Sequence, residues 1–190
     1  MSISRRSLLQ VSVASAVMGG IGAPAEAPAQ PVDISTRFRS WNYRDRFVRH
    51  RNFQVELDPV SYSSSELDQL DATFLVREGL EPYGGVSFEA RNPNLKGYFL
   101  RHQDFRLVLH KRPPSGSPEL ALFRKDATWQ RVPGRADRSN PDYQSFVSVN
   151  FPRRFIRHPN FHLFLDEIDE AKQLDRDDAT FIVEKGFKPL

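Results

Sequence analysis

Residues 155–165 read FIRHPNFHLFL, and the same pattern occurs twice more, as FVRHRNFQVEL at residues 47–57 and as FLRHQDFRLVL at residues 99–109. Each copy is followed, after a loop of variable length, by an Asp-Ala-Thr-aromatic motif, at residues 71–74, 126–129 and 178–181. Three copies of two linked motifs in the same order are the mark of an internal repeat. The sequence therefore predicts three copies of one structural unit.

The first of the two motifs has the alternation of a β-strand. Phe53, Val55 and Leu57 alternate with polar residues, and the other copies repeat this row, which would place it on one face of an extended chain. The two residues before that Phe, Arg51 and Asn52 in the first copy, are typical of a tight turn. Each copy is thus expected to form a hairpin whose second strand carries an apolar row beginning at the Phe.

Further short strands are expected on both sides of each hairpin. They are predicted after each Asp-Ala-Thr motif and, upstream of the hairpins, at residues 38–42, 87–92 and 145–150. No segment has a convincing helical period over about ten residues or more. This reading gives four strands per copy and about twelve in all.

Three copies of four strands predict an all-β fold, specifically a β-trefoil. In such a fold six strands form a short closed barrel, and three hairpins cap it around a pseudo-threefold axis; closure removes exposed sheet edges. The alternative is a three-bladed propeller-like array, which lies below the usual number of blades. The trefoil is favoured, with units expected near residues 35–82, 83–137 and 138–190.

The first 29 residues are predicted to be a signal peptide of the twin-arginine type. Arg5 and Arg6 precede a mildly apolar stretch at residues 11–23, and residues 27–29 fit a small-x-small cleavage pattern. The apolar stretch is shorter than the roughly 20 residues that span a bilayer, so no membrane anchor is expected after processing. The mature domain, residues 30–190, is expected in the periplasm or outside the cell.

Composition excludes some classes of function. The chain of 190 residues contains no Cys, which rules out disulfides and thiol chemistry. Its formal net charge of +3 is weak and scattered, which argues against a nucleic-acid partner. Zinc requires three or four converging ligands, whereas each copy repeats one His and one Asp, so no metal or other cofactor is expected.

The repeated His and Asp have two readings. His50 and Asp71 lie 21 residues apart, His102 and Asp126 lie 24 apart, and His158 and Asp178 lie 20 apart. A structural hydrogen bond that clamps the intervening loop would explain this pattern. A sugar pocket would also explain it, because an Asp carboxylate and a His ring match the donors and acceptors of neighbouring hydroxyls. The residues alone leave both readings open.

The motifs together resemble the arabinose-binding domain of α-L-arabinofuranosidase B, a family 42 carbohydrate-binding module. The resemblance covers about residues 35–187 and is carried most fully by residues 148–158 of the third copy and residues 122–129 of the second. The first copy lacks the Pro-Gly that the family usually has before the Arg-His strand. The second copy has an insertion at residues 94–97. The third copy is therefore closest to the family pattern.

The resemblance implies a β-trefoil that holds arabinofuranosyl side chains of arabinoxylan or arabinan, with one possible pocket for each copy. A monomer is expected, since nothing in the sequence demands an oligomer. The sugar-binding residues that it implies are His50, Asp71, His102, Asp126, His158 and Asp178, with Tyr43, Tyr98 and Phe151 as aromatic candidates. Glycoside hydrolysis needs two carboxylates roughly 5–10 Å apart, whereas one acidic position recurs per copy. The domain is expected to bind rather than to catalyse. A protein-interaction module with vestigial pockets is the competing expectation.

Overall fold

The computed structural model describes residues 34–82 and 84–189; the predicted signal peptide lies outside them. The first unit contains β1 (Ile34–Ser40), β2 (Arg46–Arg51), β3 (Gln54–Pro59), α1 (Glu66–Asp71) and β4 (Phe74–Glu78). The second contains β5 (Val86–Ala90), η1 (Pro93–Leu95), β6 (Tyr98–Gln103), β7 (Arg106–Lys111), α2 (Leu120–Asp126) and β8 (Trp129–Pro133). The third contains β9 (Tyr143–Ser148), β10 (Arg154–Arg157), η2 (Pro159–Phe161), β11 (Phe164–Glu167), α3 (Gln173–Asp178) and β12 (Phe181–Lys185).

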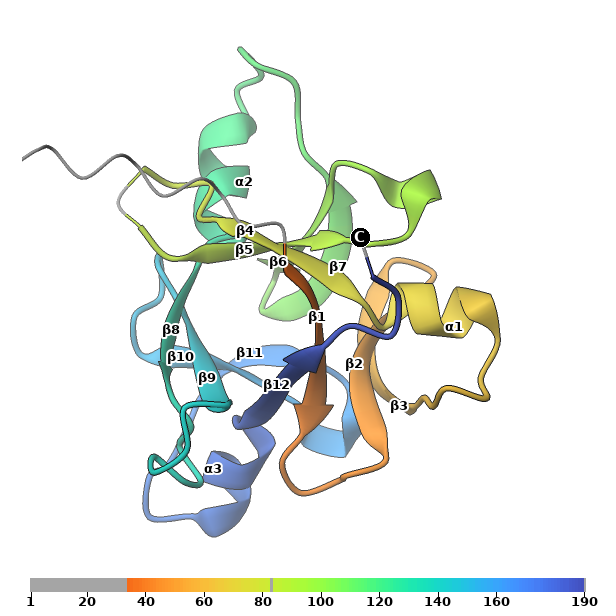
Figure 1. The fold of residues 1–190 in the computed structure, drawn as a ribbon. Coiled ribbons are helices and arrows are strands. Elements are labelled where there is room, and N and C mark those ends of the chain that lie inside the picture. The colour runs from red at the N-terminus through yellow and green to blue at the C-terminus, as the bar shows by residue number, and fades with distance from the viewer. Residues whose placement is uncertain (1–33, 83, 190) are drawn as a thin grey trace, which may run out of the picture.

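The fold is all-β, with a closed barrel and a few short helices. Strand β1 pairs with β4 and β12, β5 pairs with β4 and β8, and β9 pairs with β8 and β12, all antiparallel. Following these pairings from strand to strand returns to the starting strand, so the ring has no open edge. The three helices lie outside the strands, at three well-separated places on the periphery (Figure 1).

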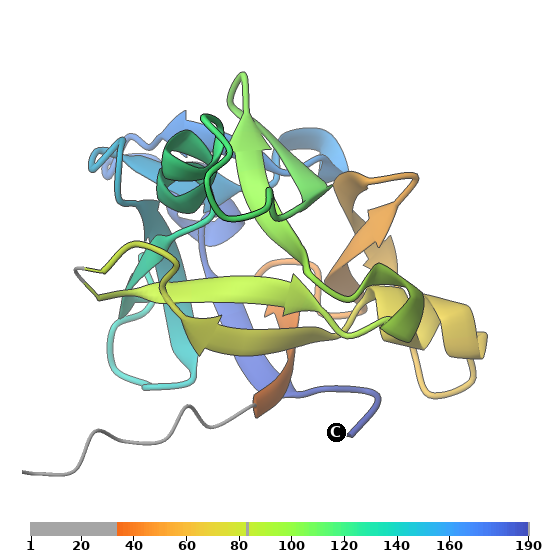
Figure 2. The ribbon, with the colours of Figure 1, turned by 90° about the horizontal axis from the view of Figure 1, so that it is seen from above.

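Three hairpins, β2–β3, β6–β7 and β10–β11, gather at one end of this barrel. Figure 2 shows them on the upper side, away from the C-terminus. They also pair with one another, through Gln54 opposite Val108, Phe164 opposite Arg106, and an isolated bridge between Glu56 and His162. These pairings make the hairpins one continuous cap.

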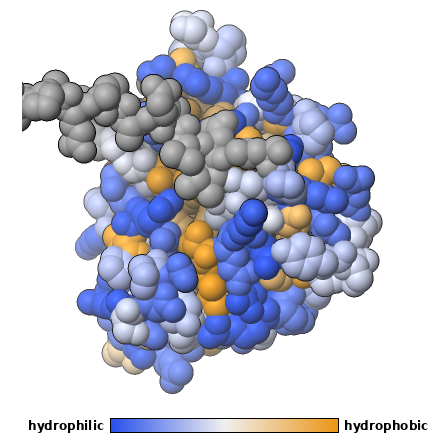
Figure 3. All heavy atoms as spheres, in the orientation of Figure 1, coloured by the Kyte–Doolittle hydropathy of each residue, from blue (hydrophilic) through white to orange (hydrophobic). Residues whose placement is uncertain are grey.

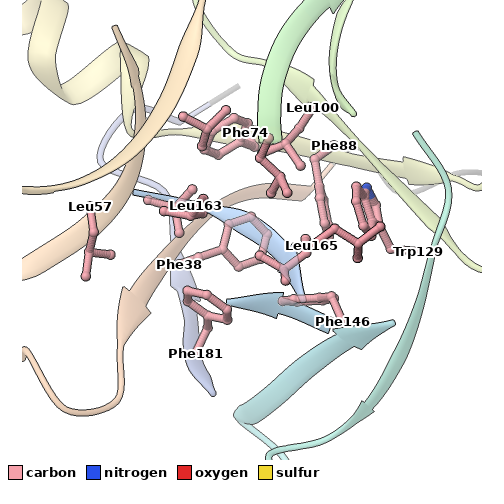
Figure 4. Close-up of a cluster of buried hydrophobic side chains, with 14 residues drawn as sticks. Phe38, Leu57, Phe74, Phe88, Leu100, Trp129, Phe146, Leu163, Leu165 and Phe181 are labelled. Carbon is pink, nitrogen blue, oxygen red and sulfur yellow. The ribbon is translucent and has the colours of Figure 1, made fainter. Parts of the chain in front are cut away.

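The core lies on the barrel axis. Phe38, Phe88 and Phe146 occupy equivalent places in β1, β5 and β9, and their ring centroids lie 4.8–5.4 Å apart in each pairing. The aromatic residues that follow the Asp-Ala-Thr motifs surround this trio and are completely buried (Figure 4): Phe74, Trp129 and Phe181. Large rings from each unit thus converge on one centre, which explains why Phe is used so heavily in this chain.

The hairpins differ from expectation at their tips. The predicted apolar row is wrong at its first position, since Phe53 and Phe105 are exposed while Val55 and Leu57 are buried. The turn lies one residue later than predicted: Arg51 still pairs with Gln54, so the two-residue loop is Asn52-Phe53. A two-residue hairpin loop requires the left-handed conformation, which takes the Phe out of the strand alternation.

The twelve strands of the described residues match the expected number, and the upstream strands lie within about four residues of their predicted starts. The helices were missed because each has only six or seven residues, too few for a helical period to show. On the face shown in Figure 3, apolar residues form small groups between polar ones. Within the described ranges, no helix has the length and apolar character that a bilayer crossing requires.

Candidate functional site

Each Asp-Ala-Thr motif ends one of the short helices. The Asp is the last helical residue and the Ala is a completely buried C-cap. The Thr hydroxyl donates to the carbonyl four positions earlier, over 2.7–2.8 Å, in Thr73, Thr128 and Thr180. This ending fixes the direction of the Asp side chain and buries it. The motif thus serves to hold a carboxylate in a fixed place at the end of a helix.

The predicted His–Asp pairs lie together in the structure. A ring nitrogen of the His approaches the Asp Oδ1 at 3.4 Å for His50 and Asp71, at 3.2 Å for His102 and Asp126, and at 3.6 Å for His158 and Asp178. All six side chains are buried. We call the surroundings of the three pairs candidate sites 1, 2 and 3, after the predicted unit that supplies the His and Asp.

A third polar residue, an Asn, completes each site and comes from the neighbouring unit. Its Nδ2 donates to the Asp Oδ1, over 2.9 Å from Asn92 to Asp71, 2.8 Å from Asn150 to Asp126 and 2.8 Å from Asn42 to Asp178. Sequence reasoning missed these residues. Their recurring position in the sequence could have identified them, since each Asn lies two residues after the end of β1, β5 or β9.

The aromatic candidates also lie in the site of the preceding unit. Tyr43 packs edge-on against Phe161 at 4.9 Å in site 3, and Phe151 packs against Phe105 at 5.3 Å in site 2. In site 1, Tyr98 stacks on Phe53 at 5.8 Å with a 19° interplanar angle. The turn Phe of each hairpin, exposed in the first two and partly buried in the third, is therefore half of an aromatic pair. Each site is shared between two units rather than contained in one copy.

Serine hydroxyls orient the Asn in two of the sites. Ser148 donates to Asn150 Oδ1 over 2.6 Å, and Ser40 donates to Asn42 Oδ1 over 2.8 Å. The Ser40 Oγ also lies 3.0 Å from His158 Nε2. In the first site the equivalent residue is Ala90, and His50 Nε2 is buried without a hydrogen-bond partner. Sites 2 and 3 therefore share a serine that site 1 lacks, while His158 Nδ1 in site 3 is likewise buried without a hydrogen-bond partner.

Site 2 opens into a cavity of about 410 Å³. The buried part of its lining is polar, and its exposed part includes both apolar and polar residues. The lining residues are Arg101, His102, Gln103, Asp104, Phe105, Leu122, Asp126, Asn150 and Phe151. A concave site that combines a few convergent polar groups with aromatic walls has the form of a small-molecule binding pocket.

Burial sets the charge state of these groups. It lowers the pKa of His158 to about 4, and it also lowers the pKa of His50 and His102. Burial raises the pKa of Asp178, although the hydrogen bond from Asn42 and the charge of Arg157 act in the opposite direction. The three imidazoles are therefore neutral near pH 7, so each ring offers one donor and one acceptor.

A model of the alpha-L-arabinofuranosidase B (ABFB) domain matches residues 36–183. The chain belongs to this family. The AbfB domain is 31% identical over 159 residues to an alpha-L-arabinofuranosidase of Hypocrea jecorina, an alignment that covers 81% of this chain and 30% of that protein. It is 29% identical over 159 residues to a probable alpha-L-arabinofuranosidase B of Aspergillus clavatus, with 29% of that protein covered. The chain thus spans about 30% of the length of these relatives.

Solved structures share the fold of this AbfB domain. A GH54 arabinofuranosidase soaked with a cyclic sulfate inhibitor superposes with a TM-score of 0.69 at 23% identity, covering 86% of this chain and 33% of that one. An arabinofuranosidase complexed with arabinofuranosyl-alpha-1,2-xylobiose gives 0.69 at 24% identity, with 85% and 33% covered. SeviL bound to asialo-GM1 saccharide gives 0.53 at 6% identity, with 80% and 98% covered.

The AbfB domain presents no metal centre in the part of the chain that the structure describes. No group of three or more His, Asp or Glu side chains there has the arrangement of a metal site. At each site the groups that face one another are one imidazole, one carboxylate and one carboxamide. The donors and acceptors of these groups are of the kind that match hydroxyls.

Proposed function

We propose that this AbfB domain is a non-catalytic carbohydrate-binding module of β-trefoil fold that recognises arabinofuranosyl side chains of hemicellulose such as arabinoxylan or arabinan. The observation that carries the proposal is the cavity of site 2, in which His102, Asp126 and Asn150 form the floor while Phe105 and Phe151 form the wall. The family of the chain supports arabinofuranose as the sugar.

The chemistry of the floor fits a furanose branch. Neighbouring hydroxyls are at once donors and acceptors, and the floor offers a carboxylate, a neutral imidazole and a carboxamide side by side. Hydrogen bonds to a charged group contribute roughly 1.5–3 kcal/mol net, and neutral ones roughly 0.5–1.5 kcal/mol. A single site of this kind corresponds to binding near 1 mM, or about −4 kcal/mol. Three sites on one body would bind a branched polymer more tightly by avidity.

The β-trefoil assignment rests on the strand pairings. Six strands pair in a closed ring, three hairpins cap one end, and the order of three strands, a helix and a strand recurs three times. Units near residues 35–82, 83–137 and 138–190 fit this recurrence. The equivalent residues Phe38, Phe88 and Phe146, which meet on the axis, support a pseudo-threefold relationship.

The carboxylate of site 2 is poorly suited to catalysis. Asp126 Oδ1 accepts a hydrogen bond from Asn150 and Oδ2 accepts one from Arg101 at 2.6 Å. Glycosidases need two carboxyl groups placed on either side of the scissile bond, whereas the other carboxylate that lines this cavity, Asp104, lies exposed at the hairpin turn. We therefore assign a binding role, and we place the arabinofuranosidase activity of the relatives in the part of their length that this chain does not match.

The predicted twin-arginine leader, residues 1–29, supports a location outside the cytoplasm, where the domain would encounter plant or cell-surface glycans. In this proposal the mature domain, residues 30–190, acts as a monomer, without a membrane anchor, and its partner is the polysaccharide.

The test is calorimetric titration of residues 30–190 with arabinofuranosyl-substituted xylo-oligosaccharides, and with unsubstituted xylo-oligosaccharides as the control ligand. Binding that requires the branch supports the proposal. If neither ligand binds at millimolar concentration, the proposal is contradicted and a protein-interaction module is favoured. The second reading has a specific observation behind it, because the buried His–Asp contacts of 3.2–3.6 Å would also clamp the helix loops in an unoccupied site.

A further inference from the structure

Exposed apolar side chains are concentrated at the three sites. Among the described residues, the large hydrophobic side chains that are exposed are Tyr43, Phe53, Tyr62, Leu67, Phe105, Leu122, Phe151 and Leu174. Four of these are aromatic residues of the walls described above, and Tyr62 lies away from the sites. The other three are leucines to which the proposed pockets give no role.

The leucines occupy one equivalent position. Leu67, Leu122 and Leu174 each lie four residues before the Asp that ends the same helix, and they are 57%, 58% and 58% exposed. Side chains four residues apart lie on the same face of a helix. Each leucine therefore lies one helical turn before the Asp of its site, and its side chain is exposed to solvent.

Exposure of this kind, repeated three times, is not explained by packing. These helices are short, and a polar residue at the position would cost no core contact, since more than half of each leucine is already in water. In α1 and α3 the residues on either side of the leucine are polar, whereas in α2 they are Ala121 and the buried Phe123. At site 2 the leucine lines the same cavity as the exposed Phe105 and Phe151, and a group of exposed apolar side chains of this kind marks a ligand-binding site.

The cavity of site 2 shows where that contact would be. Leu122 lines it together with Phe105 and Phe151, while His102 and Asp126 lie at its buried floor. A branch whose end is held at the floor must leave the pocket past this rim. The first group beyond the rim is the sugar to which the branch is attached, and a sugar ring presents C–H groups on its faces.

We infer that Leu67, Leu122 and Leu174 are specificity-determining residues that pack against the sugar carrying the arabinofuranosyl branch. This inference rests on the proposed function. It assigns the polar floor to the branch itself and the leucine rim to the adjoining main-chain sugar. Each site then distinguishes an arabinofuranosyl group on a polysaccharide from the same sugar when it is free.

The experiment compares two probes, methyl α-L-arabinofuranoside and an arabinofuranosyl-substituted xylo-oligosaccharide. They are titrated by calorimetry into the mature protein and into a triple variant, Leu67→Ala with Leu122→Ala and Leu174→Ala. Tyr62→Ala removes an exposed apolar side chain elsewhere and is the matched control. The triple variant is expected to bind the oligosaccharide roughly three- to tenfold more weakly, and to bind the methyl glycoside within about twofold of the parent protein.

Three results would overturn the inference. If the triple variant binds both probes as the parent does, the leucines do not contact the ligand. If the triple variant loses affinity for both probes equally, the leucines contact the branch and not the main chain. If the parent protein binds neither probe, the proposed function itself fails. In the first two results the parent still binds, so they contradict only the role of the leucines. A single Leu122→Ala variant, with its thermal unfolding recorded, shows that the effect does not come from unfolding.

Discussion

Arg101 Nη2 donates to Asp126 Oδ2 over 2.6 Å, and this contact distinguishes site 2 from the other two. The equivalent Arg49 and Arg157 pair most closely with Asp68 at 2.7 Å and with Asp175 at 3.0 Å, three residues before the Asp of the site, and Arg157 lies 3.7 Å from Asp178 Oδ2. In the second unit that earlier position is Phe123, which is buried and leaves Arg101 without this partner. The site carboxylate therefore takes over the pairing.

The first prediction concerns stability. Asp126→Ala would leave the largely buried Arg101 without its carboxylate, which is expected to cost about 3 kcal/mol or more of unfolding free energy. Asp178→Ala is expected to cost only about 1–2 kcal/mol, because Arg157 keeps Asp175. Denaturant unfolding of the two variants measures the difference. Equal losses would mean that the arginine pairing does not decide the energetics of these sites.

The second prediction separates the sugar pocket from the loop clamp. Asp178→Ala is expected to weaken binding of an arabinofuranosyl ligand at site 3 while leaving the domain folded, since the carboxylate would contact sugar hydroxyls. Calorimetry and thermal unfolding of the same sample give both quantities. A collapse of the melting temperature with no separate loss of binding would identify Asp178 as a clamp.

The third prediction tests the sharing of sites between units. Asn150 belongs to the third unit but donates to Asp126 of the second, so Asn150→Ala is expected to weaken site 2 by roughly tenfold and to leave site 3 unchanged. Chemical-shift perturbation with methyl α-L-arabinofuranoside resolves the sites separately. Asn94→Ala, at an exposed position of η1, is the control. Loss at site 3 in place of site 2 would contradict the cross-unit arrangement.

The fourth prediction concerns the turn Phe. Phe105 has φ 61°, a left-handed conformation that favours Gly, yet a Phe stands at the same place with φ 63° and 64° in the other hairpins. Phe105→Gly relieves this conformation but removes the ring that packs on Phe151. We expect the unfolding free energy to change by less than about 1 kcal/mol while affinity falls. Unchanged ligand affinity would show that the ring is not a wall of the site.

The fifth prediction concerns pH. Burial lowers the pKa of His158 from 6.5 to about 4, so the unfolded chain takes up a proton on this residue first as the pH falls. The stability that the neutral His158 contributes is present above about pH 6.5 and is lost between about pH 6.5 and 4, by at most about 3 kcal/mol. The raised pKa of Asp178 acts in the opposite sense, because the native carboxyl binds a proton more readily than the unfolded one.

Urea unfolding between pH 4 and 7 checks this dependence in the parent protein and in His158→Gln. The variant is expected to lose less stability over this range, since it removes one group whose native pKa is lowered. His50 and His102 remain and act with the same sign, so a slope persists. Identical slopes in the two proteins would contradict the assignment of the effect to His158.

The sequence by itself determined the all-β class, most of the strands and which His lies beside which Asp. Alternation of apolar residues is a local property of an extended chain, so Val55 and Leu57 could be placed in a strand without knowledge of their neighbours. The recurrence of His and then Asp in the same order, 20 to 24 residues apart, indicated which His belongs with which Asp. The helices were not predicted, because a segment of six or seven residues is too short to show a helical period of apolar residues.

Only the tertiary structure decided which residues complete each site. Asn42 donates to Asp178, which lies 136 residues away along the chain, because β1 closes the barrel against β12. No local pattern specifies which unit follows which around the ring. The partner of Arg101 was likewise decided by the burial of Phe123, since a charge in the interior must find a counter-charge within its reach.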